Sequence, residues 1–248
     1  MPSPADHPPR TPWLTPFPVK LLSSIATVHG HRDYDAAKSG DSAAALRLVR
    51  DLVEPQALHP LADWVAQTNP ILASAHAIER HGVNAIPEAL CGLLAAEFGC
   101  RHESLLVQAN VVGHTRADGF ARLARQPLFA GPVVAGGAYL LVDDFIGMGG
   151  TLANLRGYVL SKGAGCVGAI VLTGQPRSAT LALSVASLAT LRGTHGPDLE
   201  HWWQQRFGHA FDCLAESEAR YLRVCEPTRL TDVPGLPTIA HRRLSLSG

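Results

Sequence analysis

Four short apolar runs, spaced along the middle of the chain, restrict the fold more than any other feature of the sequence. They are residues 71–75, 104–108, 138–142 and 166–172. A strand that is covered on both faces reads as a near-continuous apolar run, and such strands belong to parallel sheets. Helical patterns lie between the runs, so the sequence predicts an α/β fold with a doubly wound, mainly parallel sheet.

The helices of this fold are indicated by apolar periodicity and by their end signals. Residues 41–53 carry apolar side chains at helical spacing, with Asp41 as the expected N-cap. Residues 85–99 place Pro87 in the first turn, where a missing N–H costs nothing. A third helix is predicted from Thr151 to about residue 163.

The two ends of the chain differ from this middle part. Residues 1–20 contain seven prolines and little apolar periodicity, which is typical of a disordered Pro-rich arm. We expect residues 21–248 to form a single domain. Within it, the segments after residue 175 look helical without the parallel pattern, and they predict a C-terminal helical cap over residues 176–248.

Composition excludes several classes of protein. The 248 residues include 21 acidic and 21 basic side chains, so bulk charge does not favour binding to nucleic acid. The five cysteines are widely spaced and form no C-x-x-C, which excludes a zinc ribbon and favours reduced thiols. No apolar run has the roughly 20 residues of a membrane span, and no secretory signal is visible. These features together predict a cytoplasmic protein.

A long connection without periodicity precedes the third apolar run. Residues 109–137 are far longer than the usual roughly 2–6 residues between α/β elements. The segment contains Arg116, Arg122 and Arg125 and no lysine. We expect it to be a mobile, basic lid.

The stretch "YLLVDDFIGMGGTL", residues 139–152, carries the chemistry. Its strand leads into the adjacent carboxylates Asp143 and Asp144, and then into a glycine-rich turn, residues 147–151, before a helix. A glycine turn at a helix N-terminus presents backbone N–H groups to an anion. Ionised carboxylates only accept hydrogen bonds, and a vicinal diol donates two. The inferred ligand therefore combines a phosphate with a diol, as in a ribose 5-phosphate unit.

This stretch has three competing interpretations. A Walker B acid requires a G-x-x-x-x-G-K-[ST] loop elsewhere, but the only lysines are Lys20, Lys38 and Lys162, and none has that setting. A dinucleotide fingerprint requires G-x-G-x-x-G, which this turn lacks. The third alternative is a strand that simply ends in an acidic turn.

The same stretch resembles the phosphoribosyl-pyrophosphate (PRPP) signature of the type I phosphoribosyltransferases. The resemblance in element order extends over about residues 68–175. It implies that the two acids hold the ribose hydroxyls, that the turn holds the 5′-phosphate, and that the loop after the first core strand holds pyrophosphate. The residues so implied to bind PRPP are Asp143, Asp144, Gly147, Met148, Gly149, Gly150, Thr151, Ser74, His76 and Arg80.

The activity that the resemblance implies is transfer of the 5-phosphoribosyl group to a nitrogenous base or related acceptor, with release of pyrophosphate. Asp143, Asp144 and the lid residue Arg116 are the implied catalytic residues. Mg²⁺ is the implied cofactor, held near the two acids largely through ribose hydroxyls, pyrophosphate and water. The implied partners are PRPP and a small acceptor from nucleotide metabolism, and a homodimer is left open.

The sequence also departs from the family pattern. Met148 replaces the first threonine of the turn, Gly147 replaces the third acid of the 6-oxopurine enzymes, and the lid lacks the orotate-type lysine. A non-catalytic PRPP- or nucleotide-binding regulatory protein on the same fold is therefore the alternative function.

Two further segments leave their roles open. Residues 28–41 are dense in polar side chains and predict either a hood over the acceptor or a solvated turn. His29 and His31 form an H-x-H pair, a weak signal for a metal. Trp202 and Trp203 favour packing of the cap over a platform for a base.

Overall fold

The structure, a computed structural model, describes residues 9–75, 78–79, 82–110, 123 and 126–225. Its centre is a five-stranded sheet in the order β1-β9-β8-β2-β5, and every neighbouring pair is parallel. The strands are β1 (Val19–Leu21), β2 (Ile71–Ser74), β5 (His102–Glu103), β8 (Ala138–Ile146) and β9 (Gly165–Gly174). The predicted parallel α/β sheet is confirmed.

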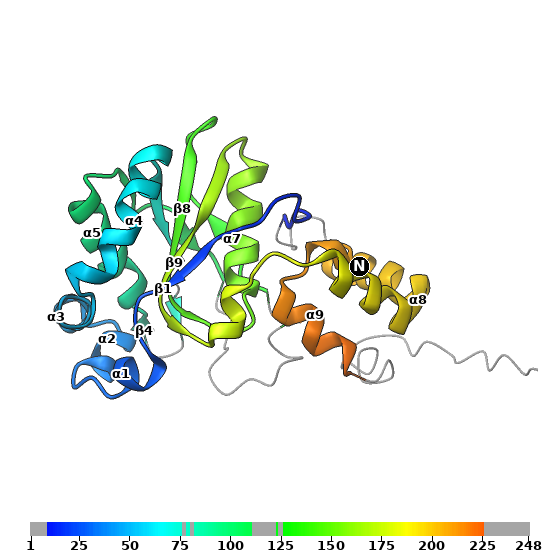
Figure 1. The fold of residues 1–248 in the computed structure, drawn as a ribbon, viewed down its shortest axis with the longest axis horizontal. Helices are drawn as coiled ribbons and strands as arrows, with labels where there is room; N and C mark the ends of the chain where they lie inside the picture. The colour runs from blue at the N-terminus through cyan, green and yellow to red at the C-terminus, as the bar shows by residue number, and fades with distance from the viewer. Residues whose placement is uncertain (1–8, 76–77, 80–81, 111–122, 124–125, 226–248) are drawn as a thin grey trace, which may run out of the picture.

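Helices cover both faces of this sheet (Figure 1). The helices before and between the first strands are α1 (Ile25–His29), α2 (Tyr34–Lys38), α3 (Ser42–Leu52), α4 (Pro55–Thr68) and α5 (Ile86–Phe98). The later helices are α7 (Gly150–Ser161), α8 (Val185–Phe207) and α9 (Glu216–Arg223), with 3₁₀ turns at Pro176–Ala179 and Phe211–Cys213. Two short antiparallel hairpins pair β3 (Ile78–Glu79) with β4 (Gly82–Val83), and β6 (Val107–Gln108) with β7 (Phe129–Ala130).

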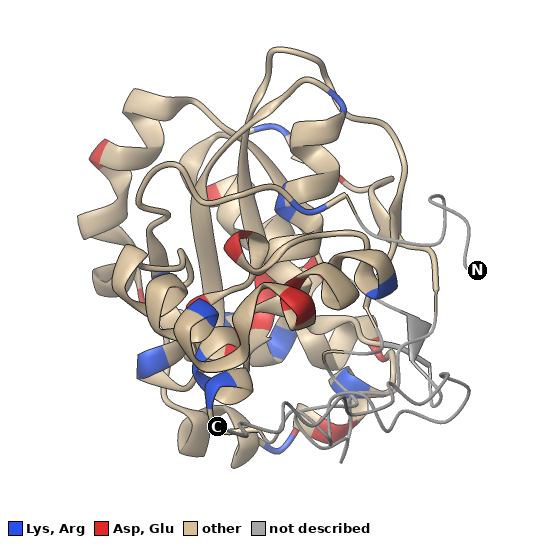
Figure 2. Ribbon diagram, turned by 90° about the vertical axis from the view of Figure 1, so that its right-hand side faces the viewer, with Lys and Arg blue, Asp and Glu red and all other residues tan. Residues whose placement is uncertain are grey.

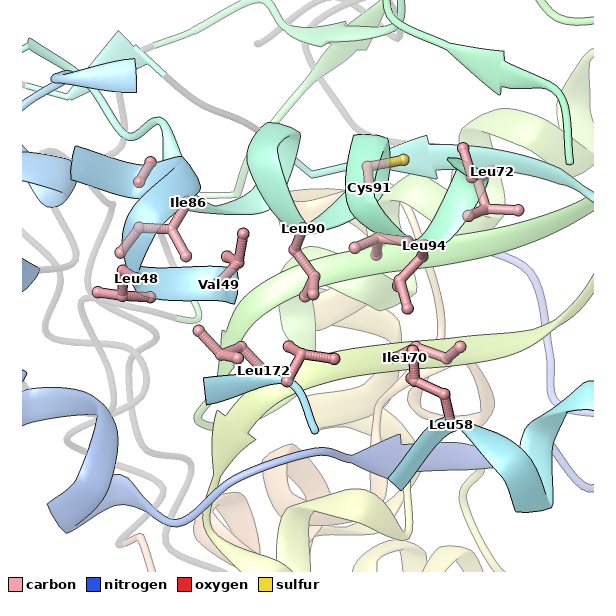
Figure 3. Packing of buried hydrophobic residues seen from close by; sticks show 14 of the residues in the cluster. Leu48, Val49, Leu58, Leu72, Ile86, Leu90, Cys91, Leu94, Ile170 and Leu172 are labelled. Carbon is pink, nitrogen blue, oxygen red and sulfur yellow. The ribbon is translucent and has the colours of Figure 1, made fainter. Parts of the chain in front are cut away.

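One core lies between the sheet and the helices α3, α4 and α5. Figure 3 shows its side chains, which include Leu48 of α3, Leu90 of α5 and Ile170 of β9, and all three are fully buried. The second core lies on the opposite face, where Leu155 and Val159 of α7 pack with alternate strand residues. Apolar contact on both faces explains why the strand sequences do not alternate.

Local signals set the ends of the predicted helices. The Asp41 carboxylate accepts a hydrogen bond from Ala44 N at 2.9 Å, which caps α3 as expected. Pro87 lies in the first turn of α5, and Gly99 ends this helix in the left-handed conformation at φ 65°. In contrast, α4 contains Pro60 and was not predicted.

The order of connections creates a switch point between β2 and β8. The chain leaves β2 through α5 to reach β5 on one side, and it leaves β8 through α7 to reach β9 on the other side. These two helices belong to opposite faces of the sheet. In open α/β sheets the ligand crevice lies at such a point, beyond the carboxyl ends of the strands.

Two predicted strands have different bounds in the structure. The run 104–108 is not a core strand: residues 104–105 form a turn, β5 precedes it, and β6 belongs to a hairpin outside the sheet. The run 138–142 continues to Ile146, so the two acids lie within β8 and not beyond its end. Apolar character alone did not show either boundary, because the deciding contacts are with strands distant in sequence.

The prediction of a disordered arm over residues 1–20 is wrong for residues 9–20. Arg10 and Phe17 are buried, and β1 adds a parallel edge strand to the sheet beside β9. The carbonyl of Pro9 lies so close to Gly157 of α7 that any Cβ there would overlap it. Prolines cannot donate to a ladder, but Pro18 O still accepts from Ala169 N at 2.9 Å, and the side chains of Arg10 and Trp13 also hold this segment (residues 9–18, the N-terminal segment).

The predicted C-terminal helices form a cap on the α7 side of the molecule (Figure 1). The described part of this cap, residues 176–225, has its own core around Trp203, which is fully buried and packs on Phe207 and Phe211 at ring distances of 4.2 and 5.9 Å. Trp203 is thus a packing residue. Gly196, at φ 73°, interrupts α8. Figure 2 shows acidic and basic segments intermingled on this side, in line with the zero net charge of the chain.

Candidate functional site

The two acids lie at the switch point, on the central strand β8. Ser74 at the end of β2 is the register partner of Val142, and Ala75 N donates to Val142 O at 2.8 Å. The carboxyl end of β2 therefore lies directly beside Asp143. The structure brings together three of the predicted site residues here: Ser74, Asp143 and Asp144.

The two carboxyl groups differ in ionisation because their surroundings differ. Both residues are buried, at 6% and 7% exposure. Burial raises the pKa of Asp143 well above its usual value, and the neighbouring Asp144 raises it further. Burial also opposes ionisation of Asp144, but the charge of Lys38 and hydrogen bonds from Lys38 and Asn84 outweigh this and lower its pKa. The surroundings thus favour the protonated form of Asp143 and the ionised form of Asp144.

Lys38 is the cation that the sequence analysis did not assign. Its Nζ donates to Asp144 Oδ2 at 2.8 Å, and the side chain comes from the end of α2. The only signal for it was the polar density of residues 28–41. Asn84 was missed entirely: its Oδ1 accepts from Ile86 N at the start of α5, while its side chain also bonds to Asp144.

The glycine turn leads into α7 as predicted. Two of its positions also require glycine because neighbouring side chains leave no room for a Cβ, which the sequence did not show. A Cβ on Gly149, at φ 88°, would collide with Leu181, and one on Gly150 would lie 2.5 Å from Glu218 Oε1 and 3.1 Å from Arg10 Nη2. The turn is therefore closely packed by the cap and the N-terminal segment on this side. Close backbone approach to a phosphate is not the only reason for glycine here.

Met148 is part of this packing. Its side chain is half-buried against the core of the cap. The residue that departs from the family pattern is thus the one that connects the turn with the cap. Gly147 and Thr151 are partly exposed beside it.

A buried ion pair joins the cap to the start of α7. The guanidinium of Arg10 makes two hydrogen bonds to the Glu218 carboxylate, at 2.6 and 2.9 Å, and it also bonds to Asn154 of α7. Glu218 Oε2 in turn accepts from Ala215 N at the start of α9, at 2.9 Å. This network contacts the glycine turn through Arg10 Nη2, which donates to Gly150 O at 3.4 Å. None of these hydrogen bonds involves Asp143 or Asp144.

Ser74 does not present a hydroxyl donor to a ligand in this structure. Its Oγ donates to Glu88 Oε2 at 2.6 Å, and His102 Nε2 lies 3.1 Å from the other oxygen of Glu88. Glu88 raises the pKa of His102, although partial burial opposes this. Among the described residues, the order Ser–Glu–His bonds the hydroxyl to a carboxylate, which is not the arrangement of a nucleophilic triad.

Aromatic side chains of the polar segment lie near the end of β8. The ring centroids of His29 and Tyr34 are 4.8 Å apart, and those of His29 and Phe145 are 6.2 Å apart. His31 pairs with Asp51 at 3.2 Å instead of joining a metal site with His29. The segment 28–41 thus lies over the acid pair, and it contributes Lys38 to it.

Three predicted residues, His76, Arg80 and Arg116, lie outside the described residues, as do residues 111–122 and 124–125 of the predicted lid. Within the part of the chain that is described, no three His, Cys, Asp or Glu side chains converge in a way that could hold a metal ion. The acid pair, with a lysine on Asp144, likewise does not fit an ion coordinated directly by the protein. Among the described helices, none combines the length and the apolar character needed to cross a membrane.

Fold and site together define an α/β protein with a parallel five-stranded sheet and a buried diacid at its topological switch point. No family model matches the chain. It is 35% identical over 215 residues to Protein TraN of Escherichia coli, a match that covers 86% of this chain and 48% of that protein. It is 34% identical over 154 residues to an uncharacterized protein of Haemophilus influenzae, covering 62% of this chain and 34% of that protein. The chain thus spans half or less of the length of these curated relatives.

Solved structures of phosphoribosyltransferases also show a likeness. An adenine phosphoribosyltransferase aligns with a TM-score of 0.36 and 17% identity, over 54% of this chain and 76% of that one. A purine phosphoribosyltransferase from Pyrococcus horikoshii aligns with a TM-score of 0.31 and 14% identity, over 49% of this chain and 82% of that one. At these TM-scores the likeness carries no argument, and the fold assignment rests on the sheet itself.

Proposed function

We propose that this chain binds PRPP at the carboxyl edge of β2 and β8 and transfers its phosphoribosyl group to a small nitrogenous acceptor. The observation that supports this most is the place of Asp143 and Asp144. They lie at the switch point of a parallel sheet, four and three residues before the glycine turn that opens α7.

The split ionisation of the two acids suits a ribose diol. In this proposal the charged Asp144 accepts a hydroxyl hydrogen bond, and the neutral Asp143 both donates and accepts. The N-terminus of α7 faces the 5′-phosphate with backbone N–H groups and the positive end of its dipole. The single negative charge of the pair stabilises positive charge that develops on the sugar as the bond to pyrophosphate breaks.

Mg²⁺ remains a prediction. When bound, it would supply positive charge to the leaving pyrophosphate. Because the described residues do not form a metal site of their own, the ion in this proposal enters with the pyrophosphate oxygens. Asp143 and Asp144 act on the ribose and not on the ion.

A second function, binding of PRPP or a nucleotide without turnover, is favoured by two contacts. Asp144 is already paired with Lys38, and the turn that would hold phosphate is packed by Leu181 and Glu218 on one side. A protein that senses its ligand would keep the binding surface and need no acceptor.

One experiment separates the two functions. Pyrophosphate release from PRPP with Mg²⁺ is measured across bases and related amines, and PRPP binding is measured by calorimetry with ATP as the control ligand. Acceptor-dependent release that Asp144→Asn abolishes supports the transferase. Binding of PRPP or of ATP without release under any acceptor supports the second function, and binding of neither ligand contradicts both functions.

A further inference from the structure

Lys38 places a positive charge directly against the acid pair. Its ammonium group is 2.8 Å from Asp144 Oδ2, and Asn84 bonds to the same carboxylate. The contact is largely shielded, because the Asp144 side chain is 9% exposed and that of Lys38 is 28% exposed. A charge-assisted hydrogen bond in such a setting is about twice as strong as one between neutral groups.

The cluster already places a cation against one of its two acids. Lys38 Nζ lies 2.8 Å from Asp144 Oδ2 and lowers the pKa of that carboxyl group, whereas burial beside Asp144 raises the pKa of Asp143. A metal ion that coordinated Asp144 would lie within a few Å of the ammonium group, and the repulsion between the two cations would be large in a buried site. Mg²⁺ is usually held by one or two carboxylates that are free to coordinate it.

We propose that Lys38 is the resident cation of this site, and that it makes binding of a sugar phosphate at Asp144 independent of free divalent metal. Lys38 is the last residue of α2, a helix that packs against α3. Ala85 N, just before α5, donates a hydrogen bond to Ala37 O of α2 at 3.2 Å. The backbone contact fixes α2 beside the start of α5, so the ammonium group is directed to the acid pair by the fold. The metal-independent binding of a sugar phosphate rests on the proposed function, whereas the role of Lys38 as the resident cation does not.

The first test uses the metal alone on the full chain. Binding of Mn²⁺ is measured by electron paramagnetic resonance for the wild type, Lys38→Met, Asp144→Asn and the double variant Lys38→Met/Asp144→Asn. We expect the wild type and Asp144→Asn to bind Mn²⁺ equally, and Lys38→Met to gain one bound ion that the double variant loses. A wild-type ion that Asp144→Asn removes would overturn the inference, as would a Lys38→Met variant that gains none.

The second test uses ribose 5-phosphate, which binds through its diol and phosphate and carries no pyrophosphate to bring a metal. Its dissociation constant is measured for the wild type in excess Mg²⁺ and in excess chelator. We expect the two values to agree within about twofold, and about tenfold weakening in chelator would contradict the inference. If ribose 5-phosphate binds under neither condition, the proposed function fails for this ligand, and the Mn²⁺ result still decides the role of Lys38.

Controls separate charge from folding. Lys38→Arg keeps the cation and should behave as the wild type does in the Mn²⁺ experiment. Lys20→Met removes an exposed lysine of β1 and should change neither measurement. If Lys38→Met melts far below the wild type, Lys38→Gln provides a second neutral variant for the same comparison, and failure of both neutral variants to gain an ion counts against the inference.

Discussion

At the scale of single residues, the acid pair shows how burial divides two identical side chains. Asp143 and Asp144 are adjacent in sequence, yet the pKa of the first is raised and that of the second is lowered, because Lys38 and Asn84 bond to the second alone. Two carboxyl groups with separated pKa values can act as one donor and one acceptor.

The pH dependence of stability should differ between the two acids. Because the folded pKa of Asp143 is raised, its stabilising effect is complete below the unfolded pKa near 3.8 and is lost as pH rises towards the folded pKa. Asp143→Asn should therefore raise the melting temperature at pH 7. For Asp144 the folded pKa is lowered, so its stabilising effect is present above pH 3.8 and is lost as pH falls. Thermal melts of both Asn variants across pH 3–8 measure this.

The same asymmetry should appear in ligand binding. Asp144→Asn removes a charged acceptor, which corresponds to roughly 1.5–3 kcal/mol, or about ten- to a hundred-fold in the dissociation constant for PRPP. Asp143→Asn should weaken binding less, because asparagine resembles a protonated carboxyl group in charge and in having both a donor and an acceptor. Calorimetry decides, and equal losses for both variants would show that both acids are charged when PRPP is bound.

Gly150 gives a test of the packing of the turn. An alanine there would press on the buried carboxylate of Glu218, which cannot move without breaking its bonds to Arg10. We expect Gly150→Ala to lower the melting temperature by several degrees, since overpacking costs about 1–3 kcal/mol.

The matched control is Gly92 of α5, where nothing lies within 4 Å of a new Cβ. Gly92→Ala should stabilise the protein by about 0.5–1 kcal/mol, because alanine loses less backbone entropy in a helix. A Gly150→Ala variant as stable as Gly92→Ala would show that the cap does not press on the turn.

At the scale of elements, the N-terminal segment, α7 and the cap are joined by one buried ion pair. The side chains of Arg10 and Glu218 are 2% and 3% exposed, and Asn154 links the same guanidinium to α7. Removal of one partner leaves an uncompensated buried charge and destabilises the folded protein, whereas removal of both partners leaves no buried charge.

A double-mutant cycle tests this junction. Arg10→Met and Glu218→Gln should each destabilise the protein by about 3–5 kcal/mol, and the double variant by clearly less than the sum. Glutamine keeps an oxygen for Ala215 N, so the start of α9 remains capped. Denaturant unfolding measures the free energies, and strictly additive values would show that the pair is not coupled.

At the scale of the whole molecule, the proposed site lies between elements from distant parts of the chain. Strands β2 and β8, helix α2 and the start of α7 all meet at one edge of the sheet, so a ligand bound there contacts several elements at once. Such a ligand stabilises the folded state as a whole.

PRPP should therefore raise the melting temperature of the full chain. At a concentration of 100 times the dissociation constant, the gain is about 2.7 kcal/mol, which corresponds to several degrees for a domain of this size. Scanning calorimetry with and without PRPP measures the shift, and Asp144→Asn should abolish most of it. An equal shift in this variant would place the ligand away from the acid pair.

Features that depend on neighbouring residues could be predicted from the sequence alone. Asp41, Pro87 and Gly99 set helix ends through local hydrogen bonds and backbone angles, and three of the apolar runs became core strands because burial on both faces requires such a run. The acids and the glycine turn were visible in one stretch of 14 residues.

The contacts that give these residues their chemistry depend on the folded chain and could not be predicted. Lys38 meets Asp144 across 106 positions of the chain, and Arg10 meets Glu218 across 208. Val19 and Lys20 of β1, assigned to a disordered arm because of the prolines before them, pair with β9 from the far end of the core. The physical reason is that the ionisation of a buried acid and the pairing of an edge strand depend on whichever groups the fold brings within a few Å, and no local pattern in the sequence encodes that distance.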